Sequence, residues 1–199
     1  MKYLIGLFTV LFSIRAISTT LPQVSIDEIY NHSVFVGIVL IEKGELIRNG
    51  ENICAAKYTA TVIESFKGNF KANEKITFGP YASQKIGREY LLFLTDKSEQ
   101  FDPVATTNSA SMKREQEFEK ICGSVLPELL IPFHGVGILE ISRPYQFKFE
   151  DSIKIPDKYI SIPSELDKRA VEFADDHISG DEYWVKEKEF IEYMRNTYK

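Results

Sequence analysis

The stretch from Cys54 to Ser65 is the feature that most constrains the fold of this 199-residue chain. Its side chains alternate between a small, aromatic or apolar set and a mainly polar set. The first set is Cys54, Ala56, Tyr58, Ala60 and Val62, and the second is Lys57, Thr59, Thr61 and Ser65. Because successive side chains of a strand point to opposite faces, this pattern predicts a half-buried β-strand. Alanines among larger residues suit the crowded interior of a narrow barrel.

Three further strands are predicted around this one. Residues 34–41 are rich in β-branched residues and read as a strand buried on both faces, with Gly37 marking a bulge. Residues 75–78 form a short strand with Ile76 and Phe78 inward, and residues 90–94 form a central strand. Residues 42–53 are expected to be a hairpin-like connection, since its Asn49-Gly50 dipeptide supplies the positive φ angles of a tight turn.

Helices are predicted at four places. A capping box at Ser25 to Glu28 indicates a short helix over 26–31, and a similar pattern at Ser164 to Asp167 indicates a helix over 164–175. A helical stripe predicts a helix over 109–125, which would carry Cys122 against the barrel. The last amphipathic helix is expected from about residue 181, with Trp184, Ile191, Met194 and Tyr198 on one stripe.

The rest of the C-terminal part has strand-like texture at 136–141, 145–149 and 159–162, separated by turn residues. The expected fold class is therefore mainly β with flanking helices. It consists of a small OB-like antiparallel barrel, a C-terminal β extension and a terminal helix.

Three motifs resemble the barrel core of the tissue-inhibitor-of-metalloproteinases-like (netrin-type) OB-fold family. They are the long strand from Cys54 that a Phe66-Lys67-Gly68 turn closes, the strand Ile76-Thr-Phe78, and the segment from Gly87 through Tyr90-Leu-Leu-Phe93. The resemblance covers about residues 25–125. It implies a small disulfide-stapled barrel that serves as a binding module.

One element of that family's mechanism is missing from this sequence. Such inhibitors insert an amino-terminal Cys into the target protease, where its free amine and carbonyl chelate the catalytic zinc. Here the expected mature chain starts at Thr19, and the first cysteine is Cys54 inside a strand. Metalloproteinase inhibition of that kind is therefore not expected.

The N-terminus reads as a secretory signal over residues 1–18. An apolar run over 3–14 is followed by small residues at Ala16 and Ser18, the positions that a signal peptidase reads. Cleavage near Ser18 would leave an extracytoplasmic chain, secreted or periplasmic, with the barrel over 19–125 and the extension over 126–199. No later segment has the roughly 20 apolar residues of a transmembrane helix. Arg15 beside the cut site leaves an uncleaved N-terminal anchor as the alternative.

The chain contains two cysteines, Cys54 and Cys122. An even count in an oxidising compartment favours a disulfide between them over two free thiols. Closing so long a loop stabilises a fold by up to about 4 kcal/mol on the chain-entropy model. A zinc or nucleophilic site is the competing interpretation, but two isolated cysteines without nearby histidines lack the spacing of metal sites.

Charge and motifs narrow the functional classes. The formal charge is −5, and an acidic chain without a basic run argues against nucleic acid as a partner. His32, His134 and His177 lie far apart, and we find no signature of a catalytic residue, a cofactor site or a metal site. Acidic residues beside His177, at 175 and 176, are interpreted as a solvated loop.

The expected function is that of a non-enzymatic binding module with a protein partner in the extracytoplasmic space. Contact would be made through a barrel face or through the loops 42–53 and 78–88, as OB barrels commonly do. Two alternatives stay open: a protease inhibitor that acts through a loop contact, and a hydrolase whose site is assembled from residues distant in sequence.

Overall fold

The computed structural model describes residues 23–79, 84–97, 117–118, 120–132, 135–144, 147–172 and 178–198. The expected signal sequence, His134 and the cluster at 175–177 lie outside these ranges, as do residues 109–116 of the helix predicted over 109–125. The elements in chain order are β1 Val24–Ser25, α1 Ile26–His32, β2 Phe35–Asn49, β3 Asn52–Lys67, β4 Lys75–Gly79, β5 Glu89–Asp96, η2 Gly123–Val125, β6 Leu129–Leu130, β7 Ile138–Ser142, β8 Ser152–Pro156, β9 Ile160–Ser161, β10 Lys168–Glu172, β11 Ile178–Lys186 and α3 Glu187–Thr197. The expected mainly β fold with a C-terminal helix is confirmed.

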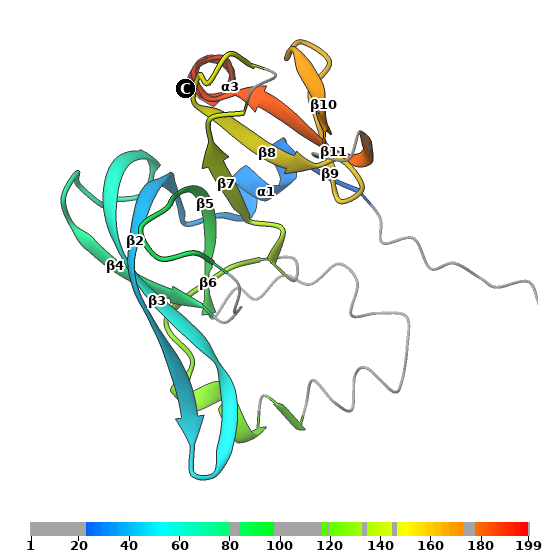
Figure 1. Ribbon diagram of the computed structural model, residues 1–199. Coiled ribbons are helices and arrows are strands. Elements are labelled where there is room, and N and C mark those ends of the chain that lie inside the picture. The colour runs from blue at the N-terminus through cyan, green and yellow to red at the C-terminus, as the bar shows by residue number, and fades with distance from the viewer. Residues whose placement is uncertain are drawn as a thin grey trace, which may run out of the picture.

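Most strands belong to one sheet with the order β10-β11-β8-β7-β5-β2-β3-β4-β6. The last strand of this order, β6, also pairs with β5, parallel to β4 on one side and antiparallel to β5 on the other. The pairings of β5, β2, β3, β4 and β6 thus return to the strand at which they began, and we call these five strands the circuit. In Figure 1 the circuit occupies the lower part of the molecule, and β8, β10, β11 and α3 lie above it.

The strand β5 is buried on both faces, as its continuous apolar character predicts. Tyr90, Leu92 and Leu94 pack inside the circuit, among the alternating residues of β2, β3 and β4. Leu91 and Phe93 point to the other face, where they pack with residues of α1, β7, β8 and α3. Two cores therefore meet at this strand, one within the circuit and one under the helices.

The inward set predicted for the long strand is confirmed from Ala56 onward. Ala56, Tyr58, Ala60 and Val62 are buried in the core of the circuit, as are Ile76 and Phe78 of β4. Cys54 is also buried, but it packs in a separate cluster because the pairing of β2 with β3 shifts register beside it. Gly37 marks a bulge in β2, where the pairing with β3 shifts register. A Cβ atom at Gly37 would clash with the carbonyl oxygen of Glu64 and lie 2.7 Å from the Phe35 ring, so glycine lets β2 and β3 approach here.

The helix α1 has the start that the sequence predicts. The Ser25 hydroxyl accepts a hydrogen bond of 3.1 Å from the backbone N–H of Glu28, which satisfies one of the free amides of the first turn. The Lys67 ammonium donates to the carbonyl oxygens of Tyr30 and Asn31 at the other end of the helix. Both ends of α1 are thus tied to neighbouring residues.

The connection over 42–53 is more regular than predicted. The strands β2 and β3 continue through it, and a tight turn at Asn49-Gly50 joins them, with Gly50 at φ +61° as expected. Pairing through Asn49 and Asn52 therefore extends the hairpin well past the other strands of the circuit.

Three predictions for the C-terminal part are wrong, and one strand was not predicted. Residues 164–166 form a turn, in which Leu166 N–H donates to Pro163, and β10 follows where the helix over 164–175 was expected. The last helix starts at Glu187, because residues 178–186 pair as β11 between β10 and β8. No strand covers 145–149 in its described part, where Phe147 and Phe149 both donate to the carbonyl oxygen of Pro144. The strand β8 over 152–156 was missed.

Candidate functional site

The most exposed part of the circuit is a two-stranded ribbon over residues 42–57, which we call the arm. The strand β5 pairs with β2 between Phe35 and Leu40, and β4 pairs with β3 between Tyr58 and Thr61. Beyond these pairings β2 and β3 are hydrogen-bonded to each other through the turn. Figure 1 shows the arm projecting from the lower end of the molecule.

One face of the arm is covered. Ile47 and Cys54 pack there with Cys122, Leu126 and Leu130 in a small cluster separate from the two main cores. Cys54 and Cys122 form a disulfide, in agreement with the prediction, and their Cα atoms are 5.5 Å apart. The helix end around Cys122 therefore lies against the arm, where the sequence predicted that it would lie against the barrel.

The turn of the arm is tied to the same segment. The Asn49 side-chain amide donates a hydrogen bond of 2.6 Å to the carbonyl oxygen of Ile121. This bond and the disulfide hold the segment near the end of the arm.

The opposite face of the arm carries exposed apolar side chains. Leu46 and Ile53 are each 58% exposed. Leu46 lies two residues before Arg48, and Arg48 pairs with Ile53, so both apolar side chains stand on the same face. Two large exposed aliphatic residues close together at the end of a projecting element form a small apolar contact surface.

Charged residues at the base of the arm pair with one another. The Glu45 carboxylate forms ion pairs with the ammonium groups of Lys43 at 2.6 Å and Lys57 at 3.6 Å. The Glu42 carboxylate pairs with Lys75 at 2.8 Å. The side-chain hydrogen bond from Lys75 is the main cause that lowers the pKa of Glu42, and that from Lys43 does the same for Glu45. Both glutamates at the base of the arm are therefore engaged by lysines.

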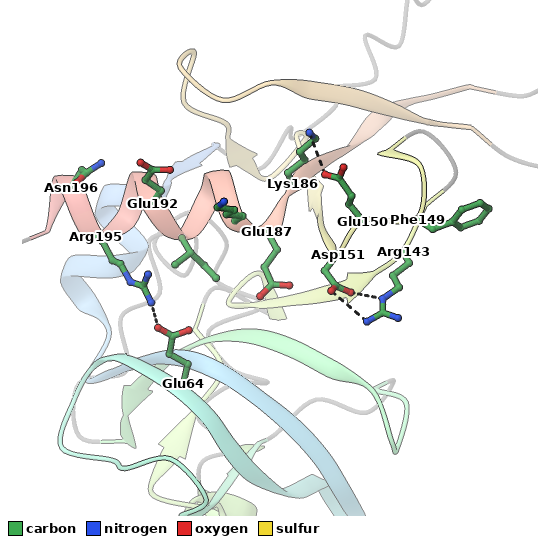
Figure 2. A pocket seen from close by; sticks show the side chains of 12 residues that line it. Glu64, Arg143, Phe149, Glu150, Asp151, Lys186, Glu187, Glu192, Arg195 and Asn196 are labelled. Carbon is green, nitrogen blue, oxygen red and sulfur yellow. Dashed lines mark hydrogen bonds and ion pairs between the residues drawn. The ribbon is translucent and has the colours of Figure 1, made fainter.

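A second surface feature is an open groove of about 790 Å³ below α3. Glu64 of β3, Phe149 and Asp151 of the β7–β8 connection, and Glu187 and Arg195 of α3 are among the residues that line it. Arg195 forms an ion pair with Glu64, which links α3 to β3 across the groove. Figure 2 shows the Glu187 side chain hanging from α3 between Glu64 and Asp151.

Carboxylates dominate the environment of Glu187. Burial is the main cause that raises the pKa of Glu187, followed by the negative charges of Asp151, Glu89 and Glu64. Asp151 forms an ion pair with Arg143, in which Nε of the arginine lies 2.7 Å from Oδ1 of the aspartate. Glu187 therefore takes up a proton more readily than an exposed glutamate does.

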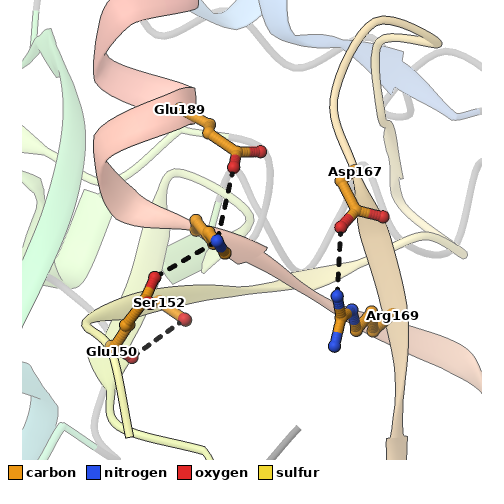
Figure 3. Close-up of polar contacts among 6 residues, drawn as sticks. Glu150, Ser152, Asp167, Arg169 and Glu189 are labelled. Atoms are coloured by element: carbon orange, nitrogen blue, oxygen red, sulfur yellow. Dashed lines mark hydrogen bonds and ion pairs between the residues drawn. The ribbon is translucent and has the colours of Figure 1, made fainter. Parts of the chain in front are cut away.

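The start of α3 is held by Lys186. Its ammonium lies 3.2 Å from Glu150 and 3.7 Å from Glu189, and Figure 3 shows these contacts of the two carboxylates. The Glu187 N–H donates a hydrogen bond to the carbonyl oxygen of Asp151. These contacts fix the helix to the β7–β8 connection. The polar residues at this end of the groove are therefore engaged in contacts that hold the fold together.

An unusual turn lies at the rim of the groove. Lys148 and Phe149 both have positive φ angles, +54° and +64°, which residues with a Cβ seldom adopt. Phe149 is 63% exposed. The hydrogen bond from Phe149 N–H to Pro144 helps to hold this turn.

The described residues contain no group of three or more His, Cys, Asp and Glu side chains placed to hold a metal ion. Nor does any helix in the described ranges have the length and apolar character to cross a membrane. Of the candidate site residues from the sequence, the structure joins Cys54 and Cys122. Sequence reasoning missed the apolar face of the arm. The signal for it was a pair of aliphatic residues, Leu46 and Ile53, flanking Asn49-Gly50 in an otherwise charged stretch.

Fold and surface together define a mainly β protein with a disulfide-stapled projecting arm and a C-terminal helix across a groove. Comparison with family models, with curated proteins and with solved structures finds no match to this chain.

Proposed function

We propose that this protein is an extracytoplasmic binding module that recognises a protein partner through the apolar face of its arm. One observation carries the proposal. Leu46 and Ile53 are exposed on the same face of a ribbon that projects from the sheet, while its other face is covered and cross-linked. A contact surface held in place before binding loses little conformational entropy when the complex forms.

The kind of partner follows from the chemistry of the arm. Lys43 and Lys57 both pair with Glu45, and ion pairs on an exposed surface contribute little, so a partner gains little by offering charges to them. Burial of Leu46 and Ile53 is the contribution that remains. The partner is therefore a folded protein with an apolar cleft that accepts these two side chains.

The strand pairings support an OB-type barrel as the body of the module. In the circuit, β2, β3 and β4 form an antiparallel meander, β5 pairs back onto β2, and β6 joins β4 and β5. This connectivity suits the resemblance to the netrin-type family. Because the segment that joins the first two strands is a common binding element of OB folds, the arm occupies a suitable place for recognition.

The disulfide supports an extracytoplasmic location, since such bonds persist in oxidising compartments. A protease is one class of partner with a cleft, and a rigid arm that enters such a cleft would inhibit it. Inhibition of a protease from the same compartment would identify that class.

Site-specific photo-crosslinking tests the proposal. A photoreactive phenylalanine analogue replaces Leu46 or Ile53 and, as a control, Ile63, which is 42% exposed on β3 outside the arm. After illumination in the native extracytoplasmic fraction, we expect the same protein adduct from both arm positions and none from position 63. The adduct identifies the partner, which is then purified.

Binding to the purified partner is measured by calorimetry. Leu46→Asp together with Ile53→Asp is expected to weaken the affinity by more than about tenfold, because the apolar contact is lost and two charges are desolvated. The matched control Ile63→Asp is expected to bind like the unchanged protein. Equal affinity of the arm variant and the unchanged protein would refute the proposal, as would adducts that form equally well at position 63.

A further inference from the structure

We infer that the Cys54–Cys122 disulfide is a redox latch: it keeps the arm rigid and one of its faces covered, and its reduction loosens the arm while the rest of the fold stays intact. The effect on binding rests on the proposed function, because it requires that the arm contacts a partner. The effect on the arm itself does not.

The contacts along the arm show why the bridge matters there. The arm lies beyond the pairings with β4 and β5 that support the body of β2 and β3. Within the described residues, the buried side chains of its covered face, Ile47 and Cys54, pack with three buried residues of the neighbouring segment, Cys122, Leu126 and Leu130. A two-stranded ribbon without further support is marginally stable in water.

In the part of the chain that the structure describes, the segment on the other side of the bridge is also held at few points. From Leu129 onward β6 is fixed by pairing with β4 and β5. Just before it, Lys97 contacts the carbonyl oxygens of Leu126 and Glu128. Further toward Cys122 the polar contact with the arm is the hydrogen bond from Asn49 to Ile121.

The latch is local because the two main cores do not depend on it. The cluster inside the circuit and the cluster under the helices consist of other residues, and neither contains Cys54 or Cys122. Opening the bridge therefore removes the cross-link from the small cluster alone. We expect the arm to exchange its amide protons more readily while the strands of the circuit remain protected.

Reduction by a dithiol completes the chemistry. A thiolate of the reductant attacks one protein sulfur and forms a mixed disulfide, and the other cysteine leaves as a thiolate. The second thiolate of the reductant then attacks the mixed disulfide and releases the second protein sulfur. Two electrons and two protons pass to the protein, which gains two thiols, and the dithiol becomes a cyclic disulfide.

Access to the sulfur atoms is restricted but not absent. Cys54 is 8% exposed and Cys122 is 4% exposed. A reductant can attack only after the segment that carries Cys122 moves slightly away from the arm. The rate of reduction therefore depends on the same motion that the disulfide restrains. A latch of this kind responds slowly to a reductant and is restored by oxidation.

Hydrogen–deuterium exchange followed by mass spectrometry tests the latch in the full mature chain. The oxidised protein is compared with the protein reduced by dithiothreitol and with the double variant Cys54→Ser, Cys122→Ser. We expect amides of residues 43–57 to exchange about tenfold faster or more in both bridge-free forms. Amides of β5 and of residues 36–40 in β2 serve as internal controls and should change little. Reoxidation should restore the slow exchange.

Two outcomes overturn the inference. Unchanged exchange of the arm after verified reduction shows that the bridge does not hold it. Faster exchange throughout β5 as well as the arm shows that the bridge supports the whole fold. The variant Leu46→Asp, Ile53→Asp keeps both cysteines and should exchange like the oxidised protein, which separates the latch from the contact surface.

Binding is then measured with the partner identified by crosslinking. The reduced protein is expected to bind about tenfold more weakly than the oxidised protein. Equal affinities refute control of binding by the bridge. If no partner is crosslinked through the arm, the proposed function fails, whereas the exchange experiment still decides whether the latch exists.

Discussion

The aromatic rings of Tyr30 and Tyr198 stack with their centroids 3.8 Å apart and their planes inclined by 10°. Tyr30 belongs to the short helix α1, and Tyr198 follows the last turn of α3. The Tyr198 hydroxyl also donates a hydrogen bond to the carboxylate of Asp27. Burial and this hydrogen bond raise the pKa of Tyr198, so the hydroxyl stays protonated and keeps donating. The first and last helices are thereby joined directly.

Replacing Tyr198 is expected to weaken the fold. Tyr198→Ala removes the stacked ring and should lower the free energy of unfolding in urea by about 1 to 3 kcal/mol. Tyr198→Phe keeps the ring and loses the hydrogen bond to Asp27, so we expect a loss of about 1 kcal/mol or less. If the phenylalanine variant loses as much as the alanine variant, the hydrogen bond and not the stacking joins the helices.

Gly37 is a glycine whose replacement should do clear harm. In Gly37→Ala the new methyl group would meet the Glu64 carbonyl oxygen and the Phe35 ring, and the backbone cannot give way without disturbing the pairing of β2 with β3. We expect a loss of about 2 kcal/mol or more, measured by chemical denaturation. Gly50→Asn is the control, because nothing lies within 4 Å of that position and asparagine tolerates a positive φ. A large loss in the control would show that the assay reports on glycine content in general.

The two capping patterns in the sequence make opposite predictions. Ser25 caps α1, so Ser25→Ala should cost about 1 kcal/mol of stability. Ser164 stands in a turn that leads into a strand, so Ser164→Ala should change the unfolding free energy by less than about 0.5 kcal/mol. Thermal and urea unfolding of both variants provide the comparison. Equal costs at the two serines would contradict the structure of the C-terminal part.

Glu187 should make stability depend on pH in the acidic range. Its pKa in the folded protein lies above the ordinary value of 4.5, so the folded state binds this proton more tightly than the unfolded state does. The cost of the buried charge is fully present above the raised pKa and disappears below about 4.5. Glu187→Gln should therefore stabilise the protein at neutral pH, by less than about 1 kcal/mol because the groove is open to solvent.

Urea unfolding at several pH values checks this expectation. The advantage of Glu187→Gln should shrink as the pH falls from neutral through the raised pKa toward 4.5, where the glutamate of the unchanged protein is itself protonated. Glu192→Gln, which removes an exposed carboxylate from the same helix, is the control. An advantage that grows toward acidic pH would show that the sign of the shift is wrong.

The N-terminal half of the chain could be predicted well because its local signals agree with its tertiary environment. The alternation from Ala56 to Val62 survives in the structure because one face points into a core, and the apolar run of β5 survives because cores lie on both sides. Such patterns are set by burial, which is the strongest local signal that a sequence carries.

The prediction for the C-terminal half failed where local helix propensity and the strand pairing of the folded protein disagree. The spacing of Leu166, Ala170, Val171 and Ala174 is helical, yet residues 168–172 form the edge strand of a sheet in which Arg169 pairs with Trp184. Phe147, Val171 and Trp184 then form a small buried cluster. Helix propensity amounts to less than about 1 kcal/mol per residue for ordinary residues, so pairing and packing override it.

The candidate site was partly foreseen. The segment 42–53 was expected to be a contact region and Cys54 and Cys122 were expected to pair, because turn residues and an even number of cysteines are local facts. That Leu46 and Ile53 share an exposed face depends on the register across the turn and on the bulge near Ile47, which no local pattern specifies.

The position of β5 has one further consequence. Its edge opposite β2 is divided between β7, which covers residues 90–92, and β6, which covers residues 95 and 96. Without β7, the backbone N–H and C=O groups of the apolar stretch from Tyr90 to Leu92 would be unpaired and open to pairing with a strand of another chain. By covering this edge, the C-terminal strand β7 also protects the protein against aggregation.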